Sequence, residues 1–310
     1  MQPTSTAESP IVPFPIVVPP TPVPGAPPPP PTPDPNISPF TRSVAPLSNG
    51  NAIIVLTQSG FTVLPSNFDA TSSTTTSARP QISNVVSTAD RSQPLTAGGL
   101  ISVLGTNFSD TTVSSNASPL PTVLGGSCVT VNGSVIPLFM VSPSQINAQL
   151  PLTTGTTGQL IVYGPGGASN PFNLSVAPSA PSVLQVPGAV GSTILVPAVF
   201  REQSSLPVNL VDPIHKGDHL IIYASGLGPT DPPVDAGSVS PTPAAVVLLK
   251  PVVTLGGVTC PVTFAGLTPG QIGVYQINVN VPQGVTQGLS VPLTVCQGTS
   301  CSTVYVRVVQ

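Results

Sequence analysis

Hydrophobic residues occur along this chain in short runs that glycine, proline, serine or threonine interrupts. Beyond position 80 the runs are rich in valine, isoleucine and leucine and recur roughly every 8–12 residues. The 3.6-residue period of an amphipathic helix is absent. Short apolar runs bounded by turn residues are typical of β-strands, so the pattern predicts an all-β chain.

The predicted strands fall into two groups, one within residues 82–178 and one within residues 179–310. The first group is Ile82–Val86, Leu100–Leu104, Ser127–Val131, Ile136–Val141, Ile146–Leu150, Gln159–Tyr163 and Phe172–Val176. The second group is Ile194–Phe200, Leu220–Ala224, Val246–Val253, Val262–Ala265, Tyr275–Val279, Leu289–Val295 and Val304–Val309. Short strands in this number and spacing predict two tandem immunoglobulin-like β-sandwiches.

Residues 1–39 hold a proline at nearly every second or third position. Proline fixes φ and has no N–H donor, so neither a helix nor a sheet ladder can form there. We predict a disordered, proline-rich N-terminal linker with extended polyproline II character.

Residues 40–70 predict a short β-hairpin segment. The apolar runs Arg42–Leu47 and Ala52–Thr57 flank Asn49-Gly50, which is a strong hairpin signal, and Phe61–Leu64 follows as a third strand. Three strands form a sheet that is barely stable alone, so the segment is interpreted either as the last blade of a truncated propeller or as an extra sheet packed on the next domain. Residues 71–81, which begin with a run of serine and threonine, predict a linker.

One sequence motif occurs twice in the predicted sandwiches. Leu124-Gly125-Gly126 is followed, 21 positions after Leu124, by Gln145-Ile146-Asn147. Leu255-Gly256-Gly257 is followed at the same distance of 21 by Gln276-Ile277-Asn278. Self-similarity at matched spacing indicates a duplicated structural unit. The units also align at Leu100–Phe108 and Leu220–Gly228, with an insertion in the second near Pro229–Pro243.

The repeated amides have two interpretations. On a strand, the isoleucine points to one face and its Gln and Asn neighbours to the other. We expect the amides to hydrogen-bond loop backbone at the end of each sandwich, where Leu-Gly-Gly supplies a turn with positive φ. Alternatively they form a sugar-binding surface through Gln145, Asn147, Gln276 and Asn278. Few aromatic side chains are present to stack on a sugar, since the chain has no tryptophan and 4 tyrosines.

The motif string from Leu124 to Pro151 resembles a duplicated C-terminal domain of uncharacterised secreted proteins of acidobacteria. The resemblance continues through Gly217–Gly228 and Gly273–Pro282 and covers about residues 82–310. It implies a fold similar to immunoglobulin-like IPT/TIG modules, which often follow propeller or other repeat regions. It carries over no catalytic residue. The chain departs from the family pattern at its cysteines and at its proline-rich start.

Charged residues make up only 5% of the chain, and the formal net charge is −3. Phosphate binding needs clustered Lys and Arg, so the sequence argues against a nucleic-acid partner. No apolar run approaches the roughly 18 residues of a membrane-spanning helix. No charged n-region followed by an apolar h-region is visible at the N-terminus. We expect a piece of a longer secreted or cell-surface protein that is monomeric in isolation.

Candidate catalytic and metal-binding residues are sparse. His215 and His219 are the only histidines, and their position at the entry to a strand predicts a solvated turn. A hydrolase would need a pocket that brings one of them beside a serine and an aspartate. Four aspartates of the second unit have no calcium-loop spacing: Asp212, Asp218, Asp231 and Asp235. We predict no metal and no cofactor.

The four cysteines predict one disulfide. Cys296 and Cys301 bracket a four-residue hairpin turn between two predicted strands, and paired strand positions suit a disulfide. Such a bond is consistent with an oxidising compartment. Cys128 and Cys260 both follow Leu-Gly-Gly, so we expect equivalent places in separate sandwiches and small, buried apolar roles.

The sequence favours a non-catalytic extracellular structural or interaction module. Its role would be adhesion, spacing or capping of a larger secreted repeat protein, through contact with a protein or glycan surface. The alternative is a carbohydrate-binding accessory module of an extracellular hydrolase.

Overall fold

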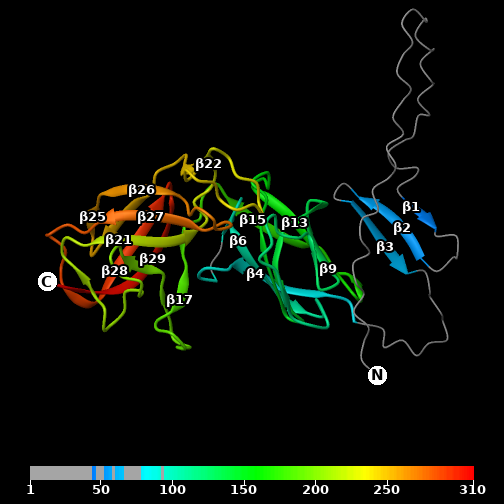
Figure 1. Ribbon diagram of the computed structural model, residues 1–310, viewed down its shortest axis with the longest axis horizontal. Helices are drawn as coiled ribbons and strands as arrows, with labels where there is room; N and C mark the ends of the chain where they lie inside the picture. The colour runs from blue at the N-terminus through cyan, green and yellow to red at the C-terminus, as the bar shows by residue number, and fades with distance from the viewer. Residues whose placement is uncertain (1–43, 47–51, 58–59, 66–77, 92–93) are drawn as a thin grey trace, which may run out of the picture. The chain divides into compact units, whose positions relative to one another are not determined.

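The computed structural model in Figure 1 describes residues 44–46, 52–57, 60–65, 78–91 and 94–310. The predicted proline-rich linker, the Asn49-Gly50 turn and the Ser/Thr run lie outside these described residues. The described residues form strands, turns and loops without a helix, which confirms the all-β prediction. The chain divides into two compact units, Met1–Ser73 and Thr74–Gln310.

The first unit contains a three-stranded antiparallel sheet. Its strands are β1 (Val44–Pro46), β2 (Ala52–Thr57) and β3 (Gly60–Pro65), in the order β1-β2-β3. The three strands predicted for this segment are therefore confirmed. Its description as a propeller blade stays a prediction.

Sandwich 1 lies at the start of the second unit and has two sheets (Figure 1). One sheet has the order β4-β6-β12-β11-β7: β4 (Gln81–Ser87), β6 (Leu100–Thr106), β12 (Gln145–Gln149), β11 (Leu138–Val141) and β7 (Val113–Ser114). The other has the order β10-β9-β13-β15-β5: β10 (Ser134–Val135), β9 (Ser127–Val131), β13 (Thr157–Gly164), β15 (Phe172–Ala177) and β5 (Leu95–Thr96). Two short strands extend this second sheet, β8 (Val123–Leu124) beside β9 and β14 (Gly167–Ala168) beside β13.

Sandwich 2 repeats this plan. Its first sheet has the order β16-β21-β27-β26-β23-β22: β16 (Ser182–Val183), β21 (His219–Ser225), β27 (Tyr275–Asn280), β26 (Val262–Leu267), β23 (Val246–Val247) and β22 (Thr230–Asp231). β19 (Val199–Arg201) also pairs with β21. The second sheet has the order β20-β29-β28-β24-β25: β20 (Ile214–His215), β29 (Ser300–Val309), β28 (Gly288–Gln297), β24 (Val252–Leu255) and β25 (Val258–Cys260).

Each sandwich encloses its own hydrophobic core. Alternate residues of the strands point inward, as period-2 patterning requires. The central isoleucine of each repeated motif is fully buried, Ile146 in the core of sandwich 1 and Ile277 in that of sandwich 2. Burying such a side chain stabilises the fold by about 1.5–3 kcal/mol. The duplicated motif therefore marks one equivalent core strand in each sandwich.

The Leu-Gly-Gly motif forms a tight hairpin turn in both sandwiches. Leu124 pairs with Ser127, and Leu255 pairs with Val258, so two glycines form each turn. Gly125 and Gly126 have φ values of 57° and 76°. Two consecutive residues at positive φ form a type I′ turn, whose twist suits a two-residue hairpin.

Strand pairing corrects three details of the predicted elements. Val246–Val253 is not one strand, because β23 and β24 belong to opposite sheets. The β17–β18 hairpin (Gln185–Pro187 and Leu195–Pro197) is inserted between β16 and β19, where the sequence predicts one strand, Ile194–Phe200. Both predictions missed a short loop, since apolar residues continue through it.

The third correction concerns the alignment of the two units. Leu100 lies opposite Gln149, and His219 lies opposite Asn280, with the repeated motif in the same register. Leu100 therefore corresponds to His219, one residue before the Leu220 expected from sequence. An apolar residue of sandwich 1 is thus replaced by a histidine in sandwich 2.

The two sandwiches are joined by hydrogen bonds, most of which involve a side chain. The Ser225 hydroxyl of sandwich 2 accepts a hydrogen bond from the Leu100 amide of sandwich 1 at 3.0 Å. The Oε1 atom of Gln149 accepts one from the Gly237 amide at 2.7 Å. Ser87 donates to the Ser182 hydroxyl at 3.2 Å. The side chains that take part are all buried: Ser87, Gln149, Ser182 and Ser225. We call this contact between the two sandwiches the joint.

Gly237 belongs to the long segment between β21 and β23, which contains the insertion predicted near Pro229–Pro243. Its carbonyl also accepts a hydrogen bond from the Leu120 amide of sandwich 1 at 2.8 Å. The insertion therefore extends the contact between the sandwiches.

Candidate functional site

The repeated amides pair with each other along their own strands. Nε2 of Gln145 donates to Oδ1 of Asn147 at 2.7 Å, and Nε2 of Gln276 donates to Oδ1 of Asn278 at 2.9 Å. Asn147 also accepts a hydrogen bond from the Ser102 hydroxyl at 3.0 Å. The expectation that these amides bind loop backbone is therefore wrong. The pairs satisfy the polar outer face of the central strands, and all four residues are half-buried.

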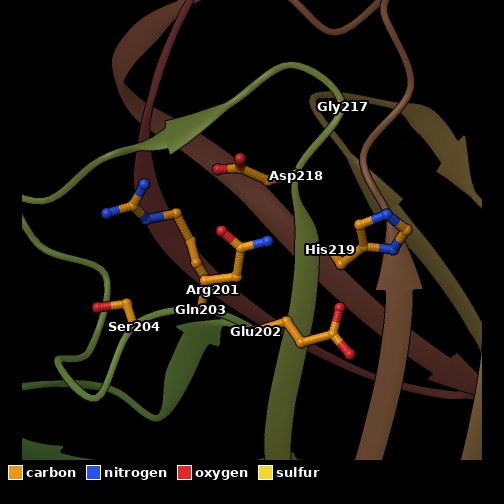
Figure 2. A pocket seen from close by; sticks show the side chains of 7 residues that line it. All are labelled: Arg201, Glu202, Gln203, Ser204, Gly217, Asp218 and His219. Carbon is orange, nitrogen blue, oxygen red and sulfur yellow. The ribbon is translucent and has the colours of Figure 1, made fainter.

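A polar cleft of about 330 Å³, drawn in Figure 2, includes His219 at the start of β21. Ser225, which takes part in the joint, ends the same strand, so the cleft lies at the end of sandwich 2 away from the joint. It is lined by the end of β19 with the turn that follows it, and by the turn that leads into β21. Its lining residues are Arg201, Glu202, Gln203, Ser204, Gly217, Asp218 and His219. The Glu202 amide donates to the His219 carbonyl at 2.9 Å, so strand pairing brings these two residues together.

A smaller depression adjoins the cleft, because Glu202 and His219 line both. Asn278 and Asn280 also line it, so the second repeated amide reaches this surface. The Oδ1 atom of Asn280 is buried without a hydrogen-bond partner among the described residues. Nε of Arg201 is likewise buried without a hydrogen-bond partner among the described residues.

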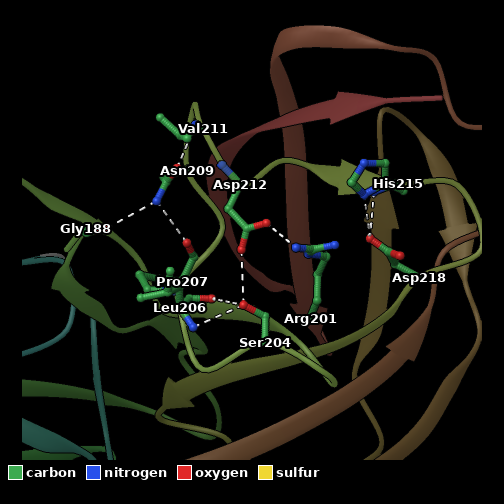
Figure 3. A network of polar contacts seen from close by, with 10 residues as sticks. All are labelled: Gly188, Arg201, Ser204, Leu206, Pro207, Asn209, Val211, Asp212, His215 and Asp218. Carbon is green, nitrogen blue, oxygen red and sulfur yellow. Dashed lines mark hydrogen bonds and ion pairs between the residues drawn. The ribbon is translucent and has the colours of Figure 1, made fainter. Parts of the chain in front are cut away.

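A network of polar contacts supports the wall of the cleft (Figure 3). The Arg201 guanidinium forms an ion pair with Asp212. Oγ of Ser204 lies 3.1 Å from Oδ2 of Asp212 and accepts a hydrogen bond from the Leu206 amide at 3.1 Å. The Asp218 carboxylate accepts a hydrogen bond from the His215 amide at 2.7 Å and so closes the turn before β21.

The cleft brings a histidine, a serine and an aspartate together without forming a catalytic triad. In Figure 2 the Ser204 hydroxyl points away from the His219 ring. Within the described part of the chain, no hydrogen bond joins His219 to Ser204 or Asp218. Nδ1 of His215 lies 3.5 Å from Oδ2 of Asp218, which is too long for a hydrogen bond. A nucleophile must lie within hydrogen-bond reach of its base, and the Ser204 hydroxyl is directed to Asp212 instead.

The four aspartates considered for calcium do not come together. Asp212 pairs with Arg201, Asp218 closes its own turn, and Asp231 lies on β22. No group of three or more His, Cys, Asp or Glu side chains able to hold a metal ion is found among the residues that the structure describes.

Cys296 and Cys301 form a disulfide, the pair expected from sequence, with a Cα–Cα distance of 4.1 Å. The turn between them is shorter than expected, because Gln297 pairs with Ser300 and leaves a two-residue turn.

The remaining cysteines are not in equivalent places. Cys128 lies opposite Val123, whereas Cys260 lies opposite Val253, one position further from the Leu-Gly-Gly turn. The expected burial is confirmed for Cys260 but is wrong for Cys128, which is half-buried. Burial raises the pKa of the Cys260 thiol to about 11 and also raises the pKa of Cys128. Both thiols are therefore protonated at neutral pH.

An apolar groove of about 390 Å³ lies between the β17–β18 hairpin and β29. Its lining includes Ile194, Leu210, Leu289 and Tyr305, which are 72%, 65%, 71% and 63% exposed. Arg307 also lines the groove and donates a hydrogen bond to the Leu210 carbonyl. Exposed apolar residues gathered in this way commonly mark an interaction surface.

Sequence reasoning missed Arg201, Glu202 and Gln149. The signal for the first two was the charge distribution, because residues 201–219 hold both histidines and five of the chain's few charged residues. Gln149 follows the repeated Gln-Ile-Asn by two positions, where Asn280 stands in the second unit. Its role depends on the neighbouring sandwich, which the local pattern does not reveal.

The fold defines the class: this is a protein of tandem immunoglobulin-like β-sandwiches. No family model matches the chain, and no curated protein does. Among the described residues, no helix is long and apolar enough to cross a membrane.

Three solved structures illustrate what the chain is similar to. SGBP-B from a xyloglucan utilization locus in Bacteroides uniformis is 15% identical, with 74% of this chain and 49% of that chain covered and a TM-score of 0.23. A surface glycan-binding protein of Prevotella bryantii is 14% identical, with 74% and 42% covered and a TM-score of 0.23. The plexin A4 extracellular region is 12% identical, with 83% and 22% covered and a TM-score of 0.26. The chain spans less than half the length of each of these proteins.

Proposed function

We propose that this chain is a non-catalytic extracellular module in which two immunoglobulin-like sandwiches form a stiff structural and interaction unit. The joint carries this proposal. Two sandwiches connected by a bare linker would move independently, whereas buried hydrogen bonds from Ser87, Leu100 and Gln149 fix one sandwich against the other. A stiff pair suits a spacer, an adhesive module or the end of a larger repeat protein.

Two further observations support an extracellular, non-catalytic role. A disulfide such as Cys296–Cys301 persists in oxidising compartments and is rare in the cytosol. The cleft presents His219 and Ser204 without the hydrogen bond that activates a nucleophile. We also propose that the chain belongs with the duplicated secreted domain that it resembles, since both copies of the motif occupy the same core strand.

Distance measurement between spin labels tests the stiffness of the joint. We would label Val135→Cys in sandwich 1 and Leu289→Cys in sandwich 2, because both positions are exposed. Cys128→Ala and Cys260→Ala are introduced into the same chain, so that neither native free thiol competes for the label. A single narrow distance distribution in the full chain supports the proposal. A broad distribution, typical of a flexible linker, contradicts it.

Carbohydrate binding is the second candidate, and the apolar groove favours it. The Tyr305 ring is 63% exposed beside the Arg307 guanidinium, which together offer a stacking face and hydrogen-bond donors for sugar hydroxyls. A glycan array probed with the full chain tests this function. Binding that is lost in Tyr305→Ala but kept in Tyr163→Ala, an exposed tyrosine of sandwich 1, would support it. An array without hits would remove it.

A further inference from the structure

The polar cleft of sandwich 2 occupies the place that the joint occupies in sandwich 1. The turns that lead into β6 and β21 have the same hydrogen bonds. The Gly98 amide donates to the Leu150 carbonyl at 3.1 Å, and the Gly217 amide donates to the Val281 carbonyl at 3.0 Å. Both glycines have positive φ, 76° and 88°. The two turns are therefore structural counterparts.

The strands beside these turns correspond as well. The Thr88 amide donates to the Leu100 carbonyl at 3.0 Å, and the Glu202 amide donates to the His219 carbonyl at 2.9 Å. Glu202 and His219, which line the cleft, thus stand where Thr88 and Leu100 stand in sandwich 1. We call this end of each sandwich its far end.

In sandwich 1 the far end is filled by sandwich 2. The Leu100 amide donates to the Ser225 hydroxyl, and Gly226 packs so closely that an added Cβ would lie 3.1 Å from Cγ2 of Thr96. In sandwich 2 the same end is open to solvent and forms the cleft in Figure 2. The cleft is therefore the empty counterpart of an occupied contact.

Unpartnered polar atoms lie at this open end. Asn280 corresponds to Gln149, whose Oε1 atom accepts a hydrogen bond from Gly237 across the joint. The Oδ1 atom of Asn280 is buried and has no partner among the described residues, and neither has Nε of Arg201. In sandwich 1 the counterpart of Asn280 has a partner from the joint, and at the end of sandwich 2 no described residue takes that partner's place.

The opposite end of sandwich 1, which we call its near end, offers the complementary surface. Gln81 pairs with Thr106 as Ser182 pairs with Ser225, so Thr106 stands in the place of the serine that bonds Leu100. The next residue, Asn107, has a φ of 61°, and its counterpart Gly226 has a φ of 82°. Thr106 and Asn107 are both exposed. A hydroxyl acceptor and a similar backbone φ are therefore available at this surface, and Asn107 adds a side chain where Gly226 has none.

The charges of the two surfaces also match. Gln81 corresponds to Ser182 by strand register, so Arg79, two residues earlier, stands at the position of Ala180. Ala180 and Gly99 line the same small cavity at the joint. Gly99 corresponds to Asp218, because their carbonyls accept from the Leu150 and Val281 amides. The Arg79 guanidinium has five N–H donors, of which Nε and Nη2 donate to the Ala168 carbonyl of its own sandwich. In a repeated joint, its remaining donors would face the Asp218 carboxylate.

We propose that the cleft of sandwich 2 binds the near end of sandwich 1 of a second copy, so that the joint is repeated between molecules. Such a contact is heterologous, and copies would add head to tail into linear assemblies. The Gly237 insertion has no counterpart in sandwich 1, and the covalent connection is missing between copies. The intermolecular contact is therefore weaker than the joint itself. This proposal departs from the monomer that the sequence favours.

Cysteine cross-linking of the full chain tests the contact directly. The double variant Thr106→Cys/His219→Cys places thiols at the counterparts of Ser225 and Leu100, and both positions are exposed. Under mild oxidation we expect a ladder of dimers, trimers and larger species on a non-reducing gel. The control variant Thr106→Cys/Leu289→Cys places its second thiol at an exposed position of the apolar groove. A ladder of equal strength in the control, or no ladder in the test variant, would overturn the proposal.

Sedimentation velocity of the unmodified chain provides a second measurement of association. It does not depend on whether a variant folds. We expect the weight-average sedimentation coefficient to rise with concentration and to rise less at high salt, which screens the Arg79–Asp218 pair. Asp218→Asn keeps an oxygen for the His215 amide and should weaken association about two- to fivefold, the effect of one exposed ion pair. Asp231→Asn, at an exposed site on β22 that belongs to neither proposed surface, should leave it unchanged. A constant coefficient up to millimolar concentration would contradict the proposal.

Discussion

Replacing Gln149 by alanine should weaken the chain far more than the same change at Asn280. Gln149 is buried, and its amide bonds two backbone groups, the Gly98 carbonyl at 2.9 Å and the Gly237 amide at 2.7 Å. Alanine removes both partners. Each buried group left unsatisfied costs about 1–3 kcal/mol, so the loss for two groups is about 2–6 kcal/mol.

Asn280 is the matched control, because it stands at the equivalent position of sandwich 2 and its Oδ1 atom has no described partner to lose. Asn280→Ala should therefore change the free energy of unfolding by less than about 1 kcal/mol.

Thermal unfolding of dilute full chain, followed by calorimetry, measures the difference. One kcal/mol lowers the melting temperature of a unit of this size by about 2–4 °C, so a loss of about 2–6 kcal/mol in Gln149→Ala should lower it by roughly 4–24 °C. The transition should also broaden or divide as the sandwiches uncouple. Equal shifts for the two variants would refute the assignment of Gln149 to a buried contact between the sandwiches.

Four further outcomes are expected. Ile146→Ala and Ile277→Ala, both fully buried, should each destabilise by about 2–5 kcal/mol in urea titration, and a loss below 1 kcal/mol would contradict their core positions. The double variant Cys296→Ser/Cys301→Ser should lose about 2 kcal/mol, because the disulfide closes only a short loop at a sequence separation of 5. Stability should fall as pH rises from 9 towards 11. Burial raises the pKa of Cys260 from 9.0 to about 11 and that of Tyr275 above its usual range, so the unfolded chain loses these protons at a lower pH than the folded chain. A urea midpoint that is constant between pH 8 and 10.5 would contradict this. The full chain should not hydrolyse ester substrates, and activity that disappears in Ser204→Ala would show that the cleft is catalytic after all.

Much of the fold was predictable because it depends on local patterns. The alternation around Ile146 and Ile277 and the glycines of Leu-Gly-Gly determine core strands and hairpin turns through short-range physics. Strand boundaries failed where apolar residues continue through a change of sheet, as between β23 and β24. Periodicity cannot detect such a crossing, because both strands are apolar and β-branched.

The site was less predictable because its contacts are distant in sequence. Gln149 reaches Gly237 across 88 positions, and Arg201 lies next to the cleft only because β19 pairs with β21 after an inserted hairpin. The repeated amides drew attention as candidate binding groups, yet Gln145 and Asn147 bond each other. The single-residue offset between Leu100 and His219 became visible only through strand register, and it is this offset that reveals the cleft as the counterpart of the joint.

The stiffness of the joint is the central claim, and ¹⁵N relaxation of the two sandwiches in dilute solution measures it most directly. If the buried contacts of Ser87, Leu100 and Gln149 hold the sandwiches together, amides of both should report the same rotational correlation time and a common diffusion tensor. Separate and shorter correlation times for the two sandwiches would contradict the account.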